Sequence, residues 1–380
     1  MKKSLIAVAV AGLFAAPVAM AEVTLSGAIN LGIEVSKSSA GPKGGSSLTK
    51  TQLNSNYSHV DLESVDDIGG GNKVIFHYQL IAQPQSVGVD NTNRNSFLGI
   101  AGGWGAFKMG TNENVYERFM YTADPLDGAL GPGGNLMILG TPGANEAFQV
   151  GQGNCAGGCV GFYRRTDHTI WYESPNFSGF SFEVDYTLSA FKTQTTDPKV
   201  LSIGGKFQPE GAPFYVDLAY EKHDDMFGTV ALGDTAGTSS KDTGIQVGGG
   251  LMLGDLGLHL RYETLKYENT KLVGSTDYKR NAVWFGVKYN LPSGYVGAEL
   301  GIAADGKLNG VKQDNTGAKM FGVGYFHNLS KQSQLQFIYG RTDNKENATY
   351  TQAGAPGDGN GSLLPGQDHQ VFHVGIKHTY

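Results

Sequence analysis

The stretch FSFEVDYTL, Phe180–Leu188, decides the fold of this chain. Apolar residues occupy every second position in it, and polar residues fill the positions between them. Successive side chains of a β-strand point to opposite faces of the sheet, so a period of two indicates a strand with one apolar and one polar face. The same alternation recurs on both sides of this stretch, which makes the chain an all-β protein.

Strands with this pattern continue along most of the chain. They are predicted at 23–35, 54–65, 74–80, 94–101, 106–111, 169–173, 180–188, 199–208, 213–222, 243–253, 256–267, 280–290, 294–304, 317–327, 333–342 and 368–380. Short connections alternate with long ones, such as 254–255 against 224–242. Short turns at one end, long loops at the other and an even number of about sixteen strands of about ten residues predict an antiparallel transmembrane β-barrel.

Composition agrees with this prediction. The chain has 56 Gly, and its 18 Tyr and 19 Phe give 37 residues of those two types. Glycine and aromatic residues without long apolar runs suit a β protein better than a helical one. No linker and no change of pattern interrupt residues 22–380, so we expect a single barrel domain.

The first 21 residues differ from the rest. Lys2 and Lys3 precede an apolar run from Leu5 to Ala16, and Ala19-Met20-Ala21 forms a small-x-small cleavage site. This order predicts a cleaved secretory signal peptide at 1–21. Its removal takes two lysines, so the net charge changes from 29 − 35 = −6 to 27 − 35 = −8. That charge argues against nucleic acid as a partner.

A barrel of about sixteen strands is too wide for side chains to fill, so its polar face must line water and its apolar face must contact lipid. Tyrosines near the strand ends suit an interfacial aromatic girdle. Those on the apolar face are Tyr78, Tyr172, Tyr186, Tyr220, Tyr262, Tyr289, Tyr325 and Tyr339. We therefore predict an exported, water-filled outer-membrane channel surrounded by lipid.

The segment 112–162 is the exception to the alternation. It is long, rich in Gly and Pro and has no clear period. A segment of this length in a compact domain is usually functional, disordered or folded into a cavity, and we predict that it folds into the barrel. Cys155 and Cys159 lie within it, and export predicts a disulfide between them. No His lies close to them in the sequence, so we predict neither a metal site nor a cofactor.

Several motifs resemble the general porins of Gram-negative bacteria, in particular the β-proteobacterial and neisserial branch. They run from end to end of the chain and are Val23–Gly27, Asp67–Gly71, Gly105–Gly110, Tyr172–Phe177, Leu329–Lys331 with Tyr339, and Val374–Tyr380. The resemblance implies a sixteen-stranded barrel, a homotrimer, and a third long loop folded inside as a constriction. It also implies that the terminal aromatic residue, here Tyr380, is a signal to the barrel-assembly machinery.

In pores of this family, acids on the inward loop face basic residues on the barrel wall, and the field between them sorts small ions and polar solutes. The resemblance assigns the loop acids to Glu113, Glu117, Asp124 and Asp127. The predicted wall residues are His59, Asp61, Glu63, Lys73, Arg94, Lys108, Arg165, Arg261 and Lys288. His59 and Glu63 stand where basic residues are common in the family, so we predict mixed or cation preference where many members prefer anions.

Three other classes of function remain open from the sequence. A substrate-specific porin for phosphate, sugars or polyols would saturate with its solute. A structural or adhesive barrel would not conduct. An outer-membrane enzyme would need a nucleophile and base held together on the barrel, and no strand end pairs Ser with His distinctively. We therefore expect a diffusion channel and no enzyme activity.

Overall fold

The computed structural model describes residues 22–86, 93–126, 132–143, 161–163, 165–190, 192–194, 197–225, 240–269, 276–352 and 363–380. Two short helices, α2 (Val115–Tyr121) and the 3₁₀-helix η1 (Asn135–Met137), lie between strands. The strands are β1 (Glu22–Ser38), β2 (Leu48–Ser55), β3 (His59–Gly69), β4 (Asn72–Ile81), β5 (Asn93–Gly102), β6 (Gly105–Glu113), β7 (Arg165–Glu173), β8 (Phe180–Thr187), β9 (Lys199–Phe207), β10 (Phe214–Asp224), β11 (Ser240–Leu253), β12 (Leu256–Asn269), β13 (Thr276–Leu291), β14 (Gly294–Ala303), β15 (Lys307–Leu308), β16 (Val311–Lys312), β17 (Ala318–Asn328), β18 (Ser333–Asn344) and β19 (His369–Thr379).

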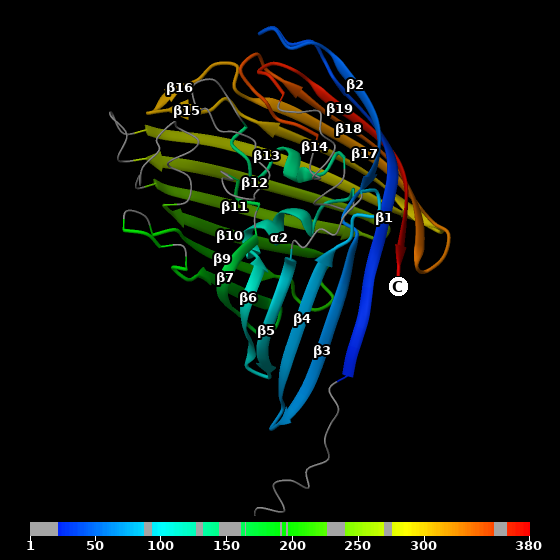
Figure 1. Ribbon diagram of the computed structural model, residues 1–380, viewed down its shortest axis with the longest axis vertical. Coiled ribbons are helices and arrows are strands. Elements are labelled where there is room, and N and C mark those ends of the chain that lie inside the picture. The colour runs from blue at the N-terminus through cyan, green and yellow to red at the C-terminus, as the bar shows by residue number, and fades with distance from the viewer. Residues whose placement is uncertain are drawn as a thin grey trace, which may run out of the picture.

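The strands form one antiparallel sheet that closes on itself (Figure 1). Most strands pair with their sequence neighbours, β14 pairs with β17, and β1 closes the ring by pairing with β19 from Ala28↔Thr379 to Ser38↔His369. The strands β2 and β3 pair with successive halves of β1 and act as one strand, and β15 with β16 forms a small hairpin outside the ring. The ring therefore has 19 − 1 − 2 = 16 strands, which confirms the predicted barrel.

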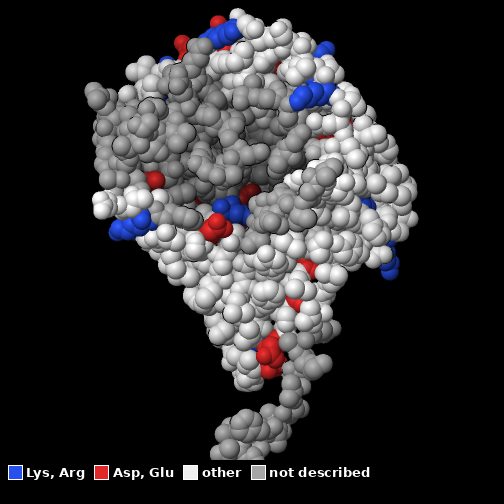
Figure 2. Space-filling model, viewed as in Figure 1, with Lys and Arg blue, Asp and Glu red and all other residues white. Residues whose placement is uncertain are grey.

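The alternation places polar side chains inside the barrel and apolar ones outside. On β8, Glu183 and Asp185 are buried while Tyr186 is exposed. The same holds on β10 and β12, where Glu221 and Glu263 are fully buried and Leu218 and Tyr262 are about half exposed. Most of the described surface seen in Figure 2 is accordingly uncharged. No helix in the described parts of the chain is long and apolar enough to cross a membrane.

Short turns mark the periplasmic end of the barrel and long connections the external end. The predicted long connection 305–316 is more ordered than its sequence suggested, because it contains the β15–β16 hairpin. Asn309 and Gly310 join these strands, and both have positive φ (50° and 78°). Asn-Gly favours the tight turn that such a pair of φ values makes.

The long segment between β6 and β7 covers residues 114 to 164, because β6 continues to Glu113 and β7 begins at Arg165. Its described residues, 114–126, 132–143 and 161–163, are called the inward segment below. The expectation of a segment without regular structure is wrong for 115–121, which forms the helix α2. Its buried residues Val115, Tyr116 and Met120 fit one helical face, but seven residues are too few for a period of 3.6 to stand out. Figure 1 shows α2 inside the ring of strands, and its contacts are with β8, β9, β10 and η1.

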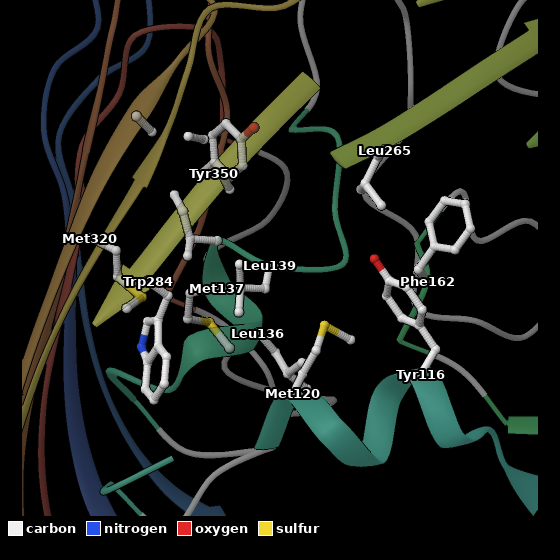
Figure 3. Packing of buried hydrophobic residues seen from close by; sticks show 14 of the residues in the cluster. Tyr116, Met120, Leu136, Met137, Leu139, Phe162, Leu265, Trp284, Met320 and Tyr350 are labelled. Atoms are coloured by element: carbon white, nitrogen blue, oxygen red, sulfur yellow. The ribbon is translucent and has the colours of Figure 1, made fainter. Parts of the chain in front are cut away.

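A hydrophobic cluster inside the barrel attaches this segment to one arc of the wall. Figure 3 shows Tyr116 and Met120 of α2 with Leu136, Met137 and Leu139, which face Trp284 and Met320 on the strands. Tyr350, from the connection between β18 and β19, joins the same cluster. The described residues of the segment therefore lie against an arc that runs from β8 to β14 and β17, and they leave a cavity on the side of β1, β3 and β5.

Small residues on the wall let the segment approach closely. An added Cβ at Gly297 would lie 2.5 Å from the Pro125 carbonyl oxygen, and one at Gly340 would lie 2.4 Å from the Gly133 nitrogen. Glycine in a strand often marks such a close approach of another part of the chain. Three predictions lie outside the described residues, namely the signal peptide at 1–21, Asp127, and the bond between Cys155 and Cys159.

Candidate functional site

A cavity of about 620 Å³ lies on the open side of the inward segment. The segment contributes Tyr121, Thr122, Asp124 and Leu126 to its lining. The wall contributes residues of β1, β3, β5, β18 and β19, which are Ser26, Gly27, Ala28, Asn30, His59, Asp61, Arg94, Gln336, Ile338, Lys377 and Thr379. The cavity is where the segment and the opposite wall leave space between them.

Arg94 owes its position in the lumen to a β-bulge. The register between β4 and β5 shifts between Tyr78↔Ser96 and Leu80↔Asn93, so β5 carries one extra residue there. Such a bulge re-aims a side chain. The Arg94 guanidinium carbon lies 4.2 Å from the centre of the Tyr57 ring, and the side chain is buried in the cavity wall.

Glu113 and Arg165 form an ion pair where the inward segment leaves and rejoins the wall. They are register partners at the ends of β6 and β7. The Tyr121 hydroxyl donates to the other oxygen of Glu113, which ties the end of α2 to the same carboxylate. Glu113 is 3% exposed, so this pair fixes the segment as well as contributing charge to the cavity.

Glu117 lies on α2, near the Glu113–Arg165 ion pair, and its side chain is buried. Burial is the main cause that raises the pKa of Glu117 to about 8, and the neighbouring charge of Glu113 adds to it. At neutral pH Glu117 is therefore mostly protonated and adds little negative charge. Of the predicted loop acids, Glu113 and Glu117 thus lie close together.

Asp124, one of the predicted loop acids, stabilises the segment itself. Its two carboxylate oxygens accept from the backbone N–H groups of Leu126 and Asn135, each at 2.7 Å. An aspartate that accepts from backbone N–H groups stabilises a turn. Asp124 also lines the cavity, so it holds the shape of the segment beside the cavity.

The predicted residues of β3 form a ladder of His and acidic side chains with β4. Asp61 lies 3.2 Å from His59 and 3.3 Å from His77, and it accepts from the Gln79 amide at 2.7 Å. Glu63 lies 3.0 Å from the other ring nitrogen of His77. Among the residues that the structure describes, no group of three or more His, Cys, Asp or Glu has an arrangement that could hold a metal ion.

The other predicted wall residues lie away from the cavity. Lys108 donates to Glu173 at 2.6 Å, and Arg261 forms two hydrogen bonds to Asp217 at 2.6 Å and 3.0 Å. Lys73 is exposed near the periplasmic turn between β3 and β4. The Lys288 ammonium lies 3.9 Å from the centre of the Tyr295 ring, near the periplasmic mouth.

Sequence reasoning missed two arginines that hold the inward segment. Arg280 on β13 is fully buried, and it contacts Glu263 and the carbonyl oxygens of Ile138 and Thr141. Arg118 on α2 pairs with Glu183. Arg280 begins the predicted strand 280–290, and its alternation with Ala282 and Trp284 on the inner face was the signal available for it.

Tyr380 lies where the last strand meets the first. Its backbone N–H donates to the Gly27 carbonyl at 3.2 Å, and its ring lies over Gly27, because a Cβ added there would be 2.8 Å from the phenol oxygen. The ring is 44% exposed. Tyr380 is therefore accessible to solvent, and its role as an assembly signal stays a prediction.

A closed barrel of sixteen strands with an apolar outer face, a polar lumen and an inward segment defines an outer-membrane channel protein. The chain matches the family model described as "Gram-negative porin" over residues 7–347. This chain therefore belongs to the Gram-negative porin family. It is an outer-membrane channel for passive diffusion and not an enzyme, as the sequence predicted.

Individual relatives agree with this assignment. The chain is 26% identical over 389 residues to "Outer membrane porin protein 32" of Delftia acidovorans, with all of both chains covered. It is 31% identical over 195 residues to "Major outer membrane protein P.IB" of Neisseria meningitidis serogroup B, and that match covers 50% of each chain.

Two solved structures share the fold. One is the "Anion-selective porin from Comamonas acidovorans", with a TM-score of 0.76, 21% identity, and coverage of 95% of this chain and 100% of that one. The other is OmpT of Vibrio cholerae in a trimer form, with a TM-score of 0.63, 12% identity, and coverage of 95% and 99%.

Proposed function

We propose that the channel filters small ions and polar solutes at a constriction between the inward segment and the open arc of the wall. The observation that carries this proposal is the cavity of about 620 Å³, which Tyr121 and Asp124 line from the segment and Arg94 and Asp61 line from the wall. Charges held on both sides of a narrow aqueous passage create a field that discriminates between ions.

The charges around this cavity support mixed ion preference. Arg94 and Lys377 bring positive charge to the lining, and Asp61, Glu113 and Asp124 bring negative charge. Elsewhere on the wall several acids have basic partners, as in the pairs Arg261–Asp217 and Arg280–Glu263. The related protein from Comamonas acidovorans is named an anion-selective porin, whereas in this chain we infer no strong preference for anions.

Reversal potentials in planar bilayers under a KCl gradient test the proposal. The wild-type channel should give a small potential, and Arg94→Gln should shift it toward cation preference, because a positive charge leaves the narrow point. Lys73→Gln removes the same charge outside the cavity and should change the potential less. Strong anion preference of the wild type, or equal shifts in both variants, would contradict the proposal.

We also propose that the chain assembles as a homotrimer. The trimer form of the solved Vibrio cholerae relative supports this. The outward residues of three neighbouring strands are apolar and suit a contact between subunits, namely Phe76, Tyr78 and Leu80 on β4, Leu98 and Ile100 on β5, and Phe107 and Met109 on β6. Light scattering of the detergent-solubilised protein should give the mass of three chains, and a monomer mass would contradict the proposal.

A further inference from the structure

A second pocket, of about 350 Å³, lies at the periplasmic mouth of the barrel. The turn Leu329–Gln332 between β17 and β18 forms its rim, and inward-facing residues of β13, β14, β18 and β19 form its wall. Three of its lining residues are lysines, and the lining is Lys288, Tyr295, Asn328, Ser330, Lys331, Gln332, Ser333, Gln334, Lys377 and Thr379. The described lining contains no Asp or Glu, so its formal charge is strongly positive.

The Lys288 ammonium is held in place by aromatic contacts. It lies 3.9 Å from the centre of the Tyr295 ring, within the range of a cation–π interaction. Tyr295 in turn stacks on Phe326, with ring centres 4.4 Å apart and planes 13° apart, and Phe326 is fully buried. This positive group is therefore fixed before any ligand arrives, which reduces the entropy lost on binding.

Lys331 lies on an ordered turn on the other side of the pocket. The Ser330 hydroxyl accepts from the backbone N–H groups of Gln332 and Ser333 at 3.1 Å and 3.0 Å, and Leu329 N–H donates to the Ser333 carbonyl at 2.8 Å. The Gln334 amide, which donates to Asn328 at 2.9 Å, lines the floor. Lys331 thus extends from a defined backbone, although its long side chain stays in water.

We propose that this pocket binds small anions that carry two or three carboxylate groups. Separate ammonium groups on Lys288, Lys331 and Lys377 can contact separate carboxylates, while the amides and hydroxyls of the lining donate to the remaining oxygens. A volume of about 350 Å³ is within the range of small-ligand sites. The pocket lies at the exit of the lumen, so an anion held there lies in the path of ions. The inference rests on the open channel, and it does not depend on the filter proposed at the constriction.

The matched control is Lys206, whose ammonium group, like that of Lys288, lies over a tyrosine ring of the neighbouring strand. Its ammonium lies 4.6 Å from the centre of the Tyr215 ring on the neighbouring strand, and it is not among the residues that line the pocket. Lys206→Gln therefore removes one positive charge from the periplasmic half of the lumen without changing the pocket. Lys377 lines both cavities and is left intact in the test.

Citrate is the probe, and single channels of known orientation in planar bilayers provide the first readout. Citrate added on the periplasmic side should reduce the KCl current at lower concentration than citrate added on the external side. Lys288→Gln with Lys331→Gln should weaken this block at least about tenfold, the loss expected when a charge-assisted contact is removed. Citrate should block the Lys206→Gln channel as strongly as the wild-type channel. Acetate at the same ionic strength should not block the wild-type current.

Isothermal titration of citrate into the detergent-solubilised protein provides a second readout that does not need conduction. Heat of binding in the wild type that is lost in the double variant supports the site. Equal block from both sides, equal weakening in Lys206→Gln, or unchanged binding in the double variant would overturn the proposal. If the channel conducts but neither readout detects citrate, only this site fails. A change of reversal potential in Arg94→Gln reports separately on the constriction.

Discussion

The Arg280 guanidinium lies 2.6 Å from the Glu263 carboxylate, and both side chains are completely buried inside the barrel. Glu263 also accepts from the Tyr116 hydroxyl at 3.1 Å and from the Gly140 N–H at 2.8 Å. Arg280 donates to the Ile138 carbonyl at 2.8 Å. This one pair on β12 and β13 therefore holds both α2 and the turn after η1 against the wall.

Arg280→Gln should loosen the inward segment. Removing one partner of a buried ion pair leaves the other charge uncompensated and typically costs about 3–5 kcal/mol. We expect noisier single-channel current and a lower unfolding temperature. Arg341→Gln, where the side chain is 44% exposed, should leave both unchanged. Wild-type current noise in Arg280→Gln would show that the pair does not hold the segment.

Glu117 should make the stability of the protein depend on pH. Its pKa is raised from the ordinary 4.5 to about 8, chiefly by burial, so between these values the folded protein holds a proton that the unfolded chain has lost. Stability should therefore fall as the pH rises from about 5 to about 9. Glu117→Gln should flatten this part of the profile of unfolding temperature against pH. Glu210→Gln, at an exposed position, should keep the wild-type slope, and the hypothesis fails if Glu117→Gln keeps it too.

Ile138→Ala tests the hydrophobic attachment of the segment. Ile138 is fully buried in the hydrophobic cluster that attaches the segment, and replacing a buried Ile by Ala typically costs about 2–5 kcal/mol. Limited proteolysis in detergent should cut the inward segment faster in this variant. Leu218→Ala, at a lipid-facing position that is 55% exposed, should be cut at the wild-type rate. Equal rates in both variants would mean that the cluster adds little to the attachment.

Reduction or replacement of the two cysteines tests whether a disulfide bond stabilises the end of the segment that leads back to the wall. A disulfide between Cys155 and Cys159 is predicted from their spacing and from export. Dithiothreitol should make the wild-type current noisier, and Cys155→Ser with Cys159→Ser should be noisy with and without it. Unchanged noise and unchanged thermal stability in the double variant would mean that the pair is incidental.

The strands could be predicted from the sequence because their signal is local. The alternation in Phe180–Leu188 and in 333–342 depends only on neighbours along the chain, and the observed β8 and β18 match these ranges within two residues. The order of short and long connections then gave the closed barrel. These features need no knowledge of which strands contact the inward segment.

The site was less predictable because it depends on register and on distant partners. Arg94 was named as a wall residue, but the bulge that turns it into the lumen depends on pairing with β4. The role of Asp124 as an acceptor for backbone N–H groups depends on Asn135, eleven residues further on. The burial of Glu117 depends on the wall that α2 faces. No pattern within one strand contains these relationships.

The inward segment lies against one arc of the barrel, and the open passage lies against the other. Residues that attach the segment come from β8, β9, β10, β12, β13, β14 and β17, whereas the cavity wall is formed mainly by β1, β3, β5, β18 and β19. Most substitutions on the second arc can therefore alter what passes without disturbing what anchors the segment; Gly340 on β18 is an exception, because it lies against Gly133. A lineage, or a protein engineer, can change the permeability of this barrel through a few positions on those five strands while its architecture stays the same.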